Sequence, residues 1–162
     1  MSFLEDRMKS IHSVEHLDQI NRWQSSRERL SADKHRPQYH FSPPENFMND
    51  PNGLCHWNGL YHLFYQFSPD GVDRVHWGHA VSEDLVRWKD LPIALYPDQE
   101  NDCFSGQTLV EDSRVIATYH GTQSGNAIAT ANDDLLLEWE KHPDNPVIPI
   151  VEIDENSGSP YR

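Results

Sequence analysis

The sequence is poor in cysteine and has no long apolar run. Cys55 and Cys103 are its two cysteines, and neither belongs to a C-x-x-C pair, so a disulfide framework or a zinc site has little support. We interpret both as reduced, packed thiols. No stretch approaches the roughly eighteen apolar residues of a membrane-spanning helix. The charged segment from Met1 to Ser10 also lacks the apolar core of a secretory signal, so the default expectation is a cytoplasmic protein.

Basic residues are few as well. Thirteen Lys and Arg stand against 26 Asp and Glu, which gives a formal net charge of −13 at pH 7. A chain with this charge repels phosphate backbones and anionic lipids, so we expect neither nucleic acid nor a membrane as a partner. The acidic residues are scattered, as between Asp98 and Asp112, which is typical of a solvated surface and not of an acidic binding tail.

What is present suffices for a globular core, because 36% of the 162 residues are hydrophobic and aromatic rings are plentiful. The first part, residues 1–34, contains neither Gly nor Pro. Apolar residues recur there at helical spacings, namely Leu4, Met8, Ile11, Leu17 and Ile20. We predict a short helical arm of two helices, the second capped by Ser13. Such an arm either binds a partner or lies on the body of its own protein, and we favour the second interpretation.

Residues 35–162 are expected to form the other part of the molecule, built from many short strands. Runs rich in Tyr, Trp, Phe, Val and Ile alternate there with Pro, Gly, Asn and Asp. Asn58 and Gly59 separate two such runs, residues 54–57 and 60–67. This pair suits the positive φ angles of a type I′ turn, so the sequence predicts a tight hairpin.

The strand-rich part also repeats itself. The aligned pairs are residues 57–66 with 111–120, 52–53 with 105–106, and 82–88 with 132–139, in which Asp84-Leu85 matches Asp134-Leu135. A unit of about fifty residues with four strands has the size and content of a β-propeller blade. The sequence therefore predicts an all-β fold with about two propeller blades after the helical arm. Chance similarity between β-hairpins is the competing interpretation.

One carboxylate stands where a propeller would use it. Asp50 is expected just before the first strand of the first unit, which in a propeller faces the central channel. The Asp-Pro and Asn-Gly pairs around it are equally ordinary turn pairs. Equivalent places carry residue types suited to sugars, because amides and hydroxyls bind sugar hydroxyls and apolar rings cover their C–H faces. These are Gln66 at the end of a strand, Trp77 at the start of one, and Phe104 and Ser105 at the start of the second unit.

Five segments share their order and content with a known family. They are Arg36-Pro37-Gln38-Tyr39-His40-Phe41, Phe47-Met48-Asn49-Asp50-Pro51-Asn52-Gly53, Tyr61-His62-Leu63-Phe64-Tyr65-Gln66, Trp77-Gly78-His79-Ala80 and Phe104-Ser105-Gly106. These segments resemble glycoside hydrolase family 32, which contains invertases, levanases, inulinases and sucrose-6-phosphate hydrolases. The resemblance covers nearly all of residues 35–150 and implies a retaining enzyme built on a five-bladed propeller that is followed by a β-sandwich.

The resemblance also implies roles for individual residues. Asp50 matches the nucleophile that attacks the anomeric carbon of fructose, and Asn49 and Gln66 match residues that hold fructosyl hydroxyls. The implied substrate-binding set is Phe47, Met48, Asn49, Gln66, Trp77, Phe104 and Ser105. Phe47 stands where the family usually has Trp, and Gln107 where it commonly has Ser. Phe keeps an apolar face but lacks the indole N–H, so the expectation is altered affinity and not lost activity.

A retaining glycosidase needs a second carboxyl group, which protonates the leaving oxygen. The resemblance implies an Arg-Asp-Pro motif and a later Glu-Cys pair, and neither is complete in the 162 residues. Arg162 matches at most the first Arg, and Glu152 and Glu155 match neither motif. We therefore expect a truncated chain, inactive alone, from an enzyme that acts on sucrose or fructans. The alternative is a catalytically incomplete propeller fragment that binds a fructoside or another protein.

A metal enzyme is a further alternative, suggested by ten His that include His76 and His79. No ligands cluster at zinc-like intervals, which disfavours it. We expect no metal and no cofactor, and a small fructoside or fructan as the substrate. Nothing in the sequence indicates the oligomeric state.

Overall fold

The computed structural model describes residues 3–150, so Glu152, Glu155 and Arg162 lie outside the described range. Within that range two helices precede nine strands. The helices are α1 (Phe3–Met8) and α2 (Val14–Leu30). The strands are β1 (Phe47–Trp57), β2 (Leu60–Ser68), β3 (His76–Ser82), β4 (Trp88–Leu95), β5 (Cys103–Val110), β6 (Val115–Gly121), β7 (Gly125–Ala131), β8 (Glu140–Lys141) and β9 (Ile148–Pro149).

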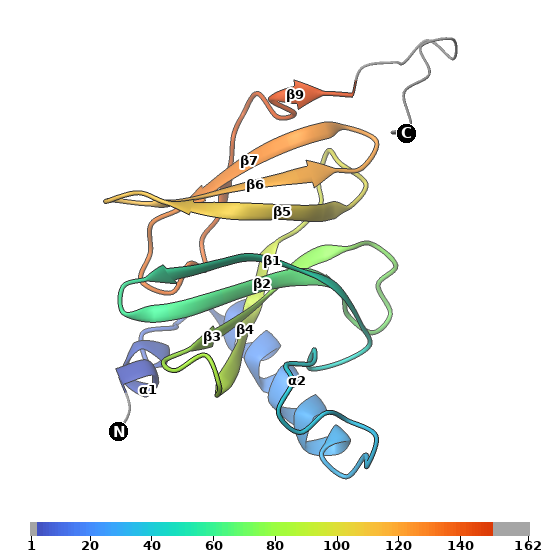
Figure 1. Ribbon diagram of the computed structural model, residues 1–162, viewed down its shortest axis with the longest axis vertical. Coiled ribbons are helices and arrows are strands. Elements are labelled where there is room, and N and C mark those ends of the chain that lie inside the picture. Colours follow the sequence, from blue (N-terminus) through green and yellow to red (C-terminus); the bar gives the residue numbers. More distant parts are fainter. Residues whose placement is uncertain (1–2, 151–162) are drawn as a thin grey trace.

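The strands form two antiparallel sheets that lie one against the other (Figure 1). The first sheet has the order β1-β2-β3-β4. The second has the order β5-β6-β7-β8, and β9 pairs with another stretch of β7. The leading strands of the two sheets, β1 and β5, are in contact. Each sheet is a meander of the kind that makes a propeller blade, so the prediction of an all-β chain with about two blades is confirmed.

The first hairpin has the predicted turn. Asn58 and Gly59 have φ angles of 46° and 85°, and the flanking residues Trp57 and Leu60 are paired. Positive φ at both central residues is the signature of a type I′ turn. The corresponding hairpin of the second blade is closed by the backbone N–H of Glu111, which donates to the carbonyl of Arg114 over 2.9 Å.

The turn between the third and fourth strands also recurs in both blades. Leu85 and Leu136 each adopt a positive φ angle, 63° and 51°. The indole N–H of Trp88 donates to the Leu85 carbonyl over 3.2 Å, and that of Trp139 donates to the Leu136 carbonyl over 2.9 Å. Leu85 therefore corresponds to Leu136. The sequence alignment of Leu85 with Leu135 was wrong by one residue, because the repeated unit is defined by the Trp–carbonyl contact and not by the Asp-Leu pair.

The main core lies between the blades. Trp77 of the first blade meets Tyr119 of the second edge-on, with ring centroids 5.9 Å apart. Cys55 and Cys103 are buried in the same core as free thiols, as predicted. Burial raises the pKa of both thiols above its ordinary value.

The first blade also encloses a histidine pair. His62 Nδ1 lies 3.0 Å from His79 Nε2, and the two residues are 0% and 1% exposed. The outer ring nitrogens, His62 Nε2 and His79 Nδ1, find no hydrogen-bond partner in residues 3–150. Burial lowers the pKa of His62 to about 4 and that of His79 well below its ordinary value. Both rings are therefore neutral at pH 7.

The amino-terminal helices lie along the outer strands of the first blade (Figure 1). Their apolar side chains join a buried core with that blade and with Leu135 of the second, comprising Leu4, Ile11, Ile20, Leu60, Val81, Leu91 and Leu135, and the partly buried Met8 and Leu137 pack against it. The Trp23 indole donates to the Leu91 carbonyl over 3.1 Å. The interpretation that the arm lies on its own protein is confirmed, although Leu17 of the predicted apolar set is 40% exposed.

The second helix begins where the sequence predicts. The Ser13 hydroxyl accepts a hydrogen bond from the backbone N–H of His16 over 3.4 Å, which is the geometry of an N-cap. Neither helix of the described chain is long and apolar enough to cross a membrane.

Candidate active site

Asp50 lies inside β1 and not before it, which corrects the predicted placement. Met48 pairs with Phe67 and Pro51 with Tyr65, so two residues, Asn49 and Asp50, stand opposite the single residue between those partners. This is a β-bulge, which bends a strand and redirects the side chains on it. The bulge also accommodates Pro51, because a proline cannot donate to a regular ladder. Asn49 and Asp50 are both exposed as a result.

The second blade has a bulge at the same place. Cys103 pairs with Gly121 and Gly106 with Tyr119, which leaves Phe104 and Ser105 opposite one residue. Strand pairing therefore matches Ser105 with Asp50, and not with Asn52 as the sequence repeat suggested. The sequence alignment missed this because β1 has a second bulge, between Asn52 and Cys55, that β5 lacks, and this extra residue shifts the register without leaving any mark in composition.

The two bulges are joined by hydrogen bonds. The Ser105 hydroxyl donates to Asp50 Oδ2. The Gln66 side-chain amide, 3% exposed on the neighbouring strand, donates to Ser105 Oγ over 2.9 Å. A hydroxyl group from the second blade is thus held between two side chains of the first. The amide fixes the orientation of the hydroxyl, and the hydroxyl fixes one oxygen of the carboxylate.

A second set of contacts joins the same strands one step further along. Asn52 is 3% exposed and its Oδ1 accepts the Gly106 backbone N–H over 3.3 Å. The Thr108 hydroxyl donates to the Gly53 carbonyl over 2.9 Å. A Cβ atom at Gly53 would lie 2.7 Å from Thr108 Cγ2, so the close approach of β1 and β5 requires glycine there. The distance between the Asp50 and Ser105 bulges is therefore set by backbone packing.

Trp77 supports this arrangement through a contact with the Phe104 backbone. Trp77 is 0% exposed, and its ring packs against the core aromatics Phe64, at a tilt, and Tyr119, edge-on. The indole N–H donates to the Phe104 carbonyl over 2.9 Å. In residues 3–150 the Trp77 ring is buried against the second blade, and its predicted place in the pocket wall stays a prediction. The ring that does reach the surface here is Phe104, which is 37% exposed.

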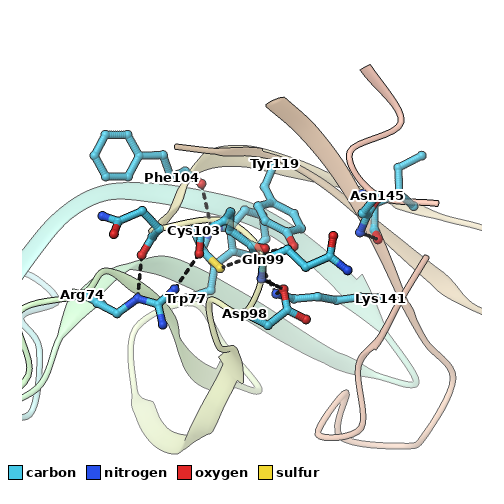
Figure 2. A network of polar contacts seen from close by, with 12 residues as sticks. Arg74, Trp77, Asp98, Gln99, Cys103, Phe104, Tyr119, Lys141 and Asn145 are labelled. Atoms are coloured by element: carbon cyan, nitrogen blue, oxygen red, sulfur yellow. Dashed lines mark hydrogen bonds and ion pairs between the residues drawn. The ribbon is translucent and has the colours of Figure 1, made fainter. Parts of the chain in front are cut away.

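The segment that leads into β5 is fixed by a buried network (Figure 2). Glu100 is 4% exposed, and its Oε1 accepts hydrogen bonds from the Tyr119 hydroxyl over 2.8 Å and the Cys103 thiol over 3.2 Å. The Lys141 ammonium lies 2.6 Å from the same oxygen and 2.9 Å from Asp98. Desolvation acts to raise the pKa of the Asp98 carboxyl, but the hydrogen bonds with Lys141, Glu100 and the Gln99 backbone, together with the Lys141 charge, outweigh it and hold that pKa at about 2. The network anchors the residues immediately before the Phe104–Ser105 bulge.

An open hollow lies beside Asp50. It is lined by Phe41, Ser42, Pro43, Asn46, Phe47, Met48, Asn49, Asp50 and Pro51. Phe47 is 47% exposed and presents an apolar ring next to the polar side chains of the bulge. In residues 3–150 no group of three or more His, Cys, Asp or Glu side chains is arranged to hold a metal ion.

Comparison with known families decides the identity. The model of the "Glycosyl hydrolases family 32 N-terminal domain" matches residues 40–159, which is most of the chain. The chain belongs to glycoside hydrolase family 32. Among the relatives of this family 32 chain, a levanase of Bacillus subtilis (strain 168) is 43% identical over 130 residues, or 71% of this chain and 19% of the levanase. An acid beta-fructofuranosidase of Vicia faba is 42% identical over 126 residues, or 70% of this chain and 20% of that enzyme.

Solved structures agree with the assignment to family 32. The crystal structure of fructan 1-exohydrolase IIa from Cichorium intybus is 40% identical, with a TM-score of 0.68 over 74% of this chain and 25% of that one. The Bombyx mori family 32 beta-fructofuranosidase is 36% identical, with a TM-score of 0.62 over 82% of this chain and 32% of that one. The present chain thus spans about a fifth of the length of these curated relatives, at 19% and 20%.

Sequence reasoning missed one wall of the candidate site. Residues 41–43 line the hollow beside Asp50 although they precede the first strand by several positions. Phe41 ended a segment that was noted for its resemblance, but nothing in its pattern indicated where the segment lies in space. Asn52 was also missed as the residue whose buried amide links the blades. The neighbouring Gly53 was the feature of the sequence that could have indicated this role of Asn52. Gly53 has a φ of 51°, and β5 approaches closely there.

Proposed function

We propose that these residues form the nucleophile half of a retaining glycoside hydrolase that cleaves terminal β-D-fructofuranosides, with Asp50 as the nucleophile. The observation that carries the proposal is the hydrogen-bonded series Gln66–Ser105–Asp50. A carboxylate that attacks carbon must be accessible, ionised and fixed in direction. Asp50 is exposed, accepts a hydrogen bond at one oxygen, and lies beside an open hollow.

The proposed first step forms an ester. In residues 3–150 no hydrogen bond occupies Asp50 Oδ1, so that atom is the one directed at the anomeric carbon of the fructosyl unit. As the new C–O bond forms, the glycosidic C–O bond breaks, and the leaving oxygen takes a proton from a general acid. Water then hydrolyses the ester with the same acid, now a base, accepting the proton. The Ser105 hydrogen bond keeps the Asp50 carboxylate in one rotamer during both steps.

The binding roles proposed for the other residues follow from their exposure. Asn49 and Phe47 are exposed beside Asp50, so the amide can meet a sugar hydroxyl and the ring can cover a C–H face. Met48 is half-buried between them, and Phe104 offers a second ring from the other blade. Gln66 is buried, and we propose that it acts on the substrate together with Ser105, whose hydroxyl it orients.

The substrate class rests on the relatives. Their names include levanase, acid beta-fructofuranosidase and sucrose:sucrose 1-fructosyltransferase. Solved relatives include fructan 1-exohydrolase IIa in complex with 1-kestose and a beta-fructofuranosidase in complex with sucrose. Sucrose and fructans share a terminal β-fructofuranosyl unit, and we propose that unit as the group recognised beside Asp50.

The proposed reaction also needs a general acid. The sequence assigns no residue of the 162 to that role, and positioned acid catalysis typically contributes about 10²–10⁴-fold to the rate. We therefore expect the 162-residue chain alone to release no fructose from sucrose, inulin or levan. Steady release that disappears in Asp50→Asn would contradict this and indicate an acid among these residues.

The nucleophile can be tested without the acid. β-D-Fructofuranosyl fluoride has a leaving group that needs no protonation, so the chain itself is expected to form the Asp50 ester. Mass spectrometry of the intact protein is expected to find one added fructosyl unit, and digestion to place it on the peptide that contains Asp50. Asp50→Asn should abolish the adduct, whereas Asp112→Asn, which removes an exposed carboxylate from the turn before β6, should not. Persistent labelling in Asp50→Asn would overturn the assignment, and fructose binding without any adduct would favour the binding-module alternative.

A further inference from the structure

Helix α2 sends two guanidinium groups toward the segment that enters β1. Arg22 forms a bidentate ion pair with Glu45, from Nε to Oε1 over 2.8 Å and from Nη2 to Oε2 over 2.7 Å. Glu45 is 3% exposed and also accepts the Asp70 backbone N–H over 3.0 Å. Both carboxylate oxygens of Glu45 are therefore used, and the side chain has one orientation.

Arg27, further along α2, reaches the same segment. Its Nη2 donates to the Ser42 carbonyl over 3.0 Å and to Asp90 over 2.7 Å. Its guanidinium carbon also lies 5.8 Å from the centre of the Phe41 ring. The Arg27 guanidinium of helix α2 thus contacts both strand β4 and residues 41–42.

These contacts end at the candidate site. Residues 41–43 and 46 line the hollow together with Asp50 and its neighbours in β1. Between them Asn46 turns the chain with a φ of 40°, and its side-chain amide donates to the Ser68 carbonyl over 3.0 Å. Glu45 directly precedes this turn. Any movement of Glu45 therefore changes the direction in which β1 starts, within five residues of Asp50 in the sequence.

The alternative is that the ion pairs only attach the arm to the blade. That attachment already exists, since Leu4, Ile11, Ile20 and Trp23 are buried against the strands. A buried carboxylate adds little net stability over an apolar side chain of the same size, because removing it from water offsets most of the attraction. What such a pair does provide is a fixed geometry. Its placement at the entry to β1 points to the hollow.

We propose that helix α2 is a positioning element for the sugar site, in which Arg22 through Glu45, and Arg27 through the Ser42 carbonyl, hold residues 41–46 in the wall beside Asp50. The inference rests on the proposed function of Asp50. It assigns to the arm a role in binding and not in bond cleavage. The family model begins at residue 40, so the positioning residues Arg22 and Arg27 lie in a part of the chain that it does not cover.

The test uses the kinetics of labelling by β-D-fructofuranosyl fluoride. Arg22→Met keeps an apolar stem and removes the ion pair with Glu45. We expect the fluoride concentration for half-maximal labelling to rise about tenfold, with the maximal labelling rate changed by less than about twofold, because the nucleophile itself is untouched. Arg22→Lys keeps the charge without the bidentate geometry and should fall between parent and Arg22→Met.

A matched control comes from the same arm. Arg7 pairs with Asp134, far from residues 41–46, so Arg7→Met removes an arm ion pair without touching the wall. It should leave both labelling parameters unchanged. Amide hydrogen exchange gives a second readout, in which Arg22→Met should speed exchange in residues 41–50 and leave β6 and β7 unaffected.

The outcomes separate the two proposals. If the parent chain is labelled at Asp50 and Arg22→Met changes neither the half-maximal concentration nor the exchange of residues 41–50, the positioning role is wrong and the nucleophile assignment stands. If Arg7→Met raises the half-maximal concentration as much as Arg22→Met does, the ion pairs act only through stability, which also overturns the inference. Absence of labelling in the parent chain overturns the proposed function and the inference with it.

Discussion

At the scale of residues, the Ser105 hydroxyl links the two blades at the candidate site. Ser105 accepts a hydrogen bond from Gln66 and donates one to Asp50, although the serine belongs to one blade and its two partners to the other. The hydroxyl can meet both only because the two bulges face each other. The orientation of the carboxylate is therefore decided by packing between blades and not by the local sequence around Asp50.

Removing that hydroxyl tests its contribution. A hydrogen bond to a charged group contributes about 1.5–3 kcal/mol, so Ser105→Ala is expected to slow maximal labelling of Asp50 by about tenfold or more. Ser113→Ala, in the exposed turn before β6, is the control and should have no effect. Labelling rates measured by intact mass would decide the matter. An unchanged rate in Ser105→Ala would show that the carboxylate is held in place by other contacts.

The buried histidine pair predicts a pH dependence of stability. His62 has a folded-state pKa of about 4, below the ordinary value of 6.5, so the unfolded chain binds the proton first as the pH falls. The stability contributed by the neutral ring is present above pH 6.5 and is lost progressively between pH 6.5 and 4, by up to about 3 kcal/mol. His79, whose pKa is lowered well below its ordinary value, acts in the same direction.

Urea unfolding at pH 7.5 and pH 5 would measure this loss. The parent chain should unfold at a lower urea concentration at pH 5. His62→Phe combined with His79→Phe should flatten the dependence, whereas His35→Asn, at an exposed position, should leave it in place. Equal pH dependence in the parent and the double variant would show that other groups, such as the carboxylates of Glu45 or Asp98, dominate the acid sensitivity.

At the scale of elements, strand β5 is supported by Trp77 of strand β3. Trp77 is fully buried and its indole bonds the Phe104 carbonyl. Trp77→Ala should therefore destabilise the fold by about 3–5 kcal/mol, the usual cost of emptying a large buried site. Phe104→Ala removes an exposed ring and should instead weaken fructoside binding with little change in stability.

Thermal unfolding and labelling kinetics of these two variants would distinguish support from contact. A Trp77→Ala chain that kept its melting temperature but lost affinity would restore Trp77 to the pocket wall, as the sequence first suggested.

Elements were predictable where a short motif dictates the backbone. The Asn58-Gly59 turn, the Ser13 cap and the repeated four-strand unit were all predicted from residue types and spacing. The two bulges were not, because a bulge depends on which residues of the next strand pair with its flanks. The burial of Trp77 was also not predictable, since the side chains that cover it come from β5 and β6, which are distant in the sequence.

The whole chain combines a strongly negative charge with exposed apolar side chains on its second blade. Leu109 and Val110 at the end of β5 are 60% and 43% exposed, and Ile148 in β9 is 60% exposed. Such side chains favour association, and the net charge of −13 opposes it. We therefore expect the 162-residue chain to be monomeric in dilute buffer and to associate as salt screens the charge.

Light scattering across a salt series would test this balance. Leu109→Asp should raise the salt concentration needed for association, whereas Val14→Asp, at an even more exposed position on the arm, should raise it much less. Association that is independent of salt, or equally affected by both substitutions, would contradict the prediction.

The paired bulges have a consequence for how such a molecule can change over time. Asp50 and Ser105 are the same position in two copies of one structural unit, yet one carries the proposed reaction and the other only orients it. A duplicated unit can keep its strands and turns while the residue at its bulge drifts, because the bulge takes its shape from the neighbouring strand and not from the side chain it displays. Chemistry and architecture are then free to evolve separately, and a new specificity requires only a new residue at a position that already borders the candidate site.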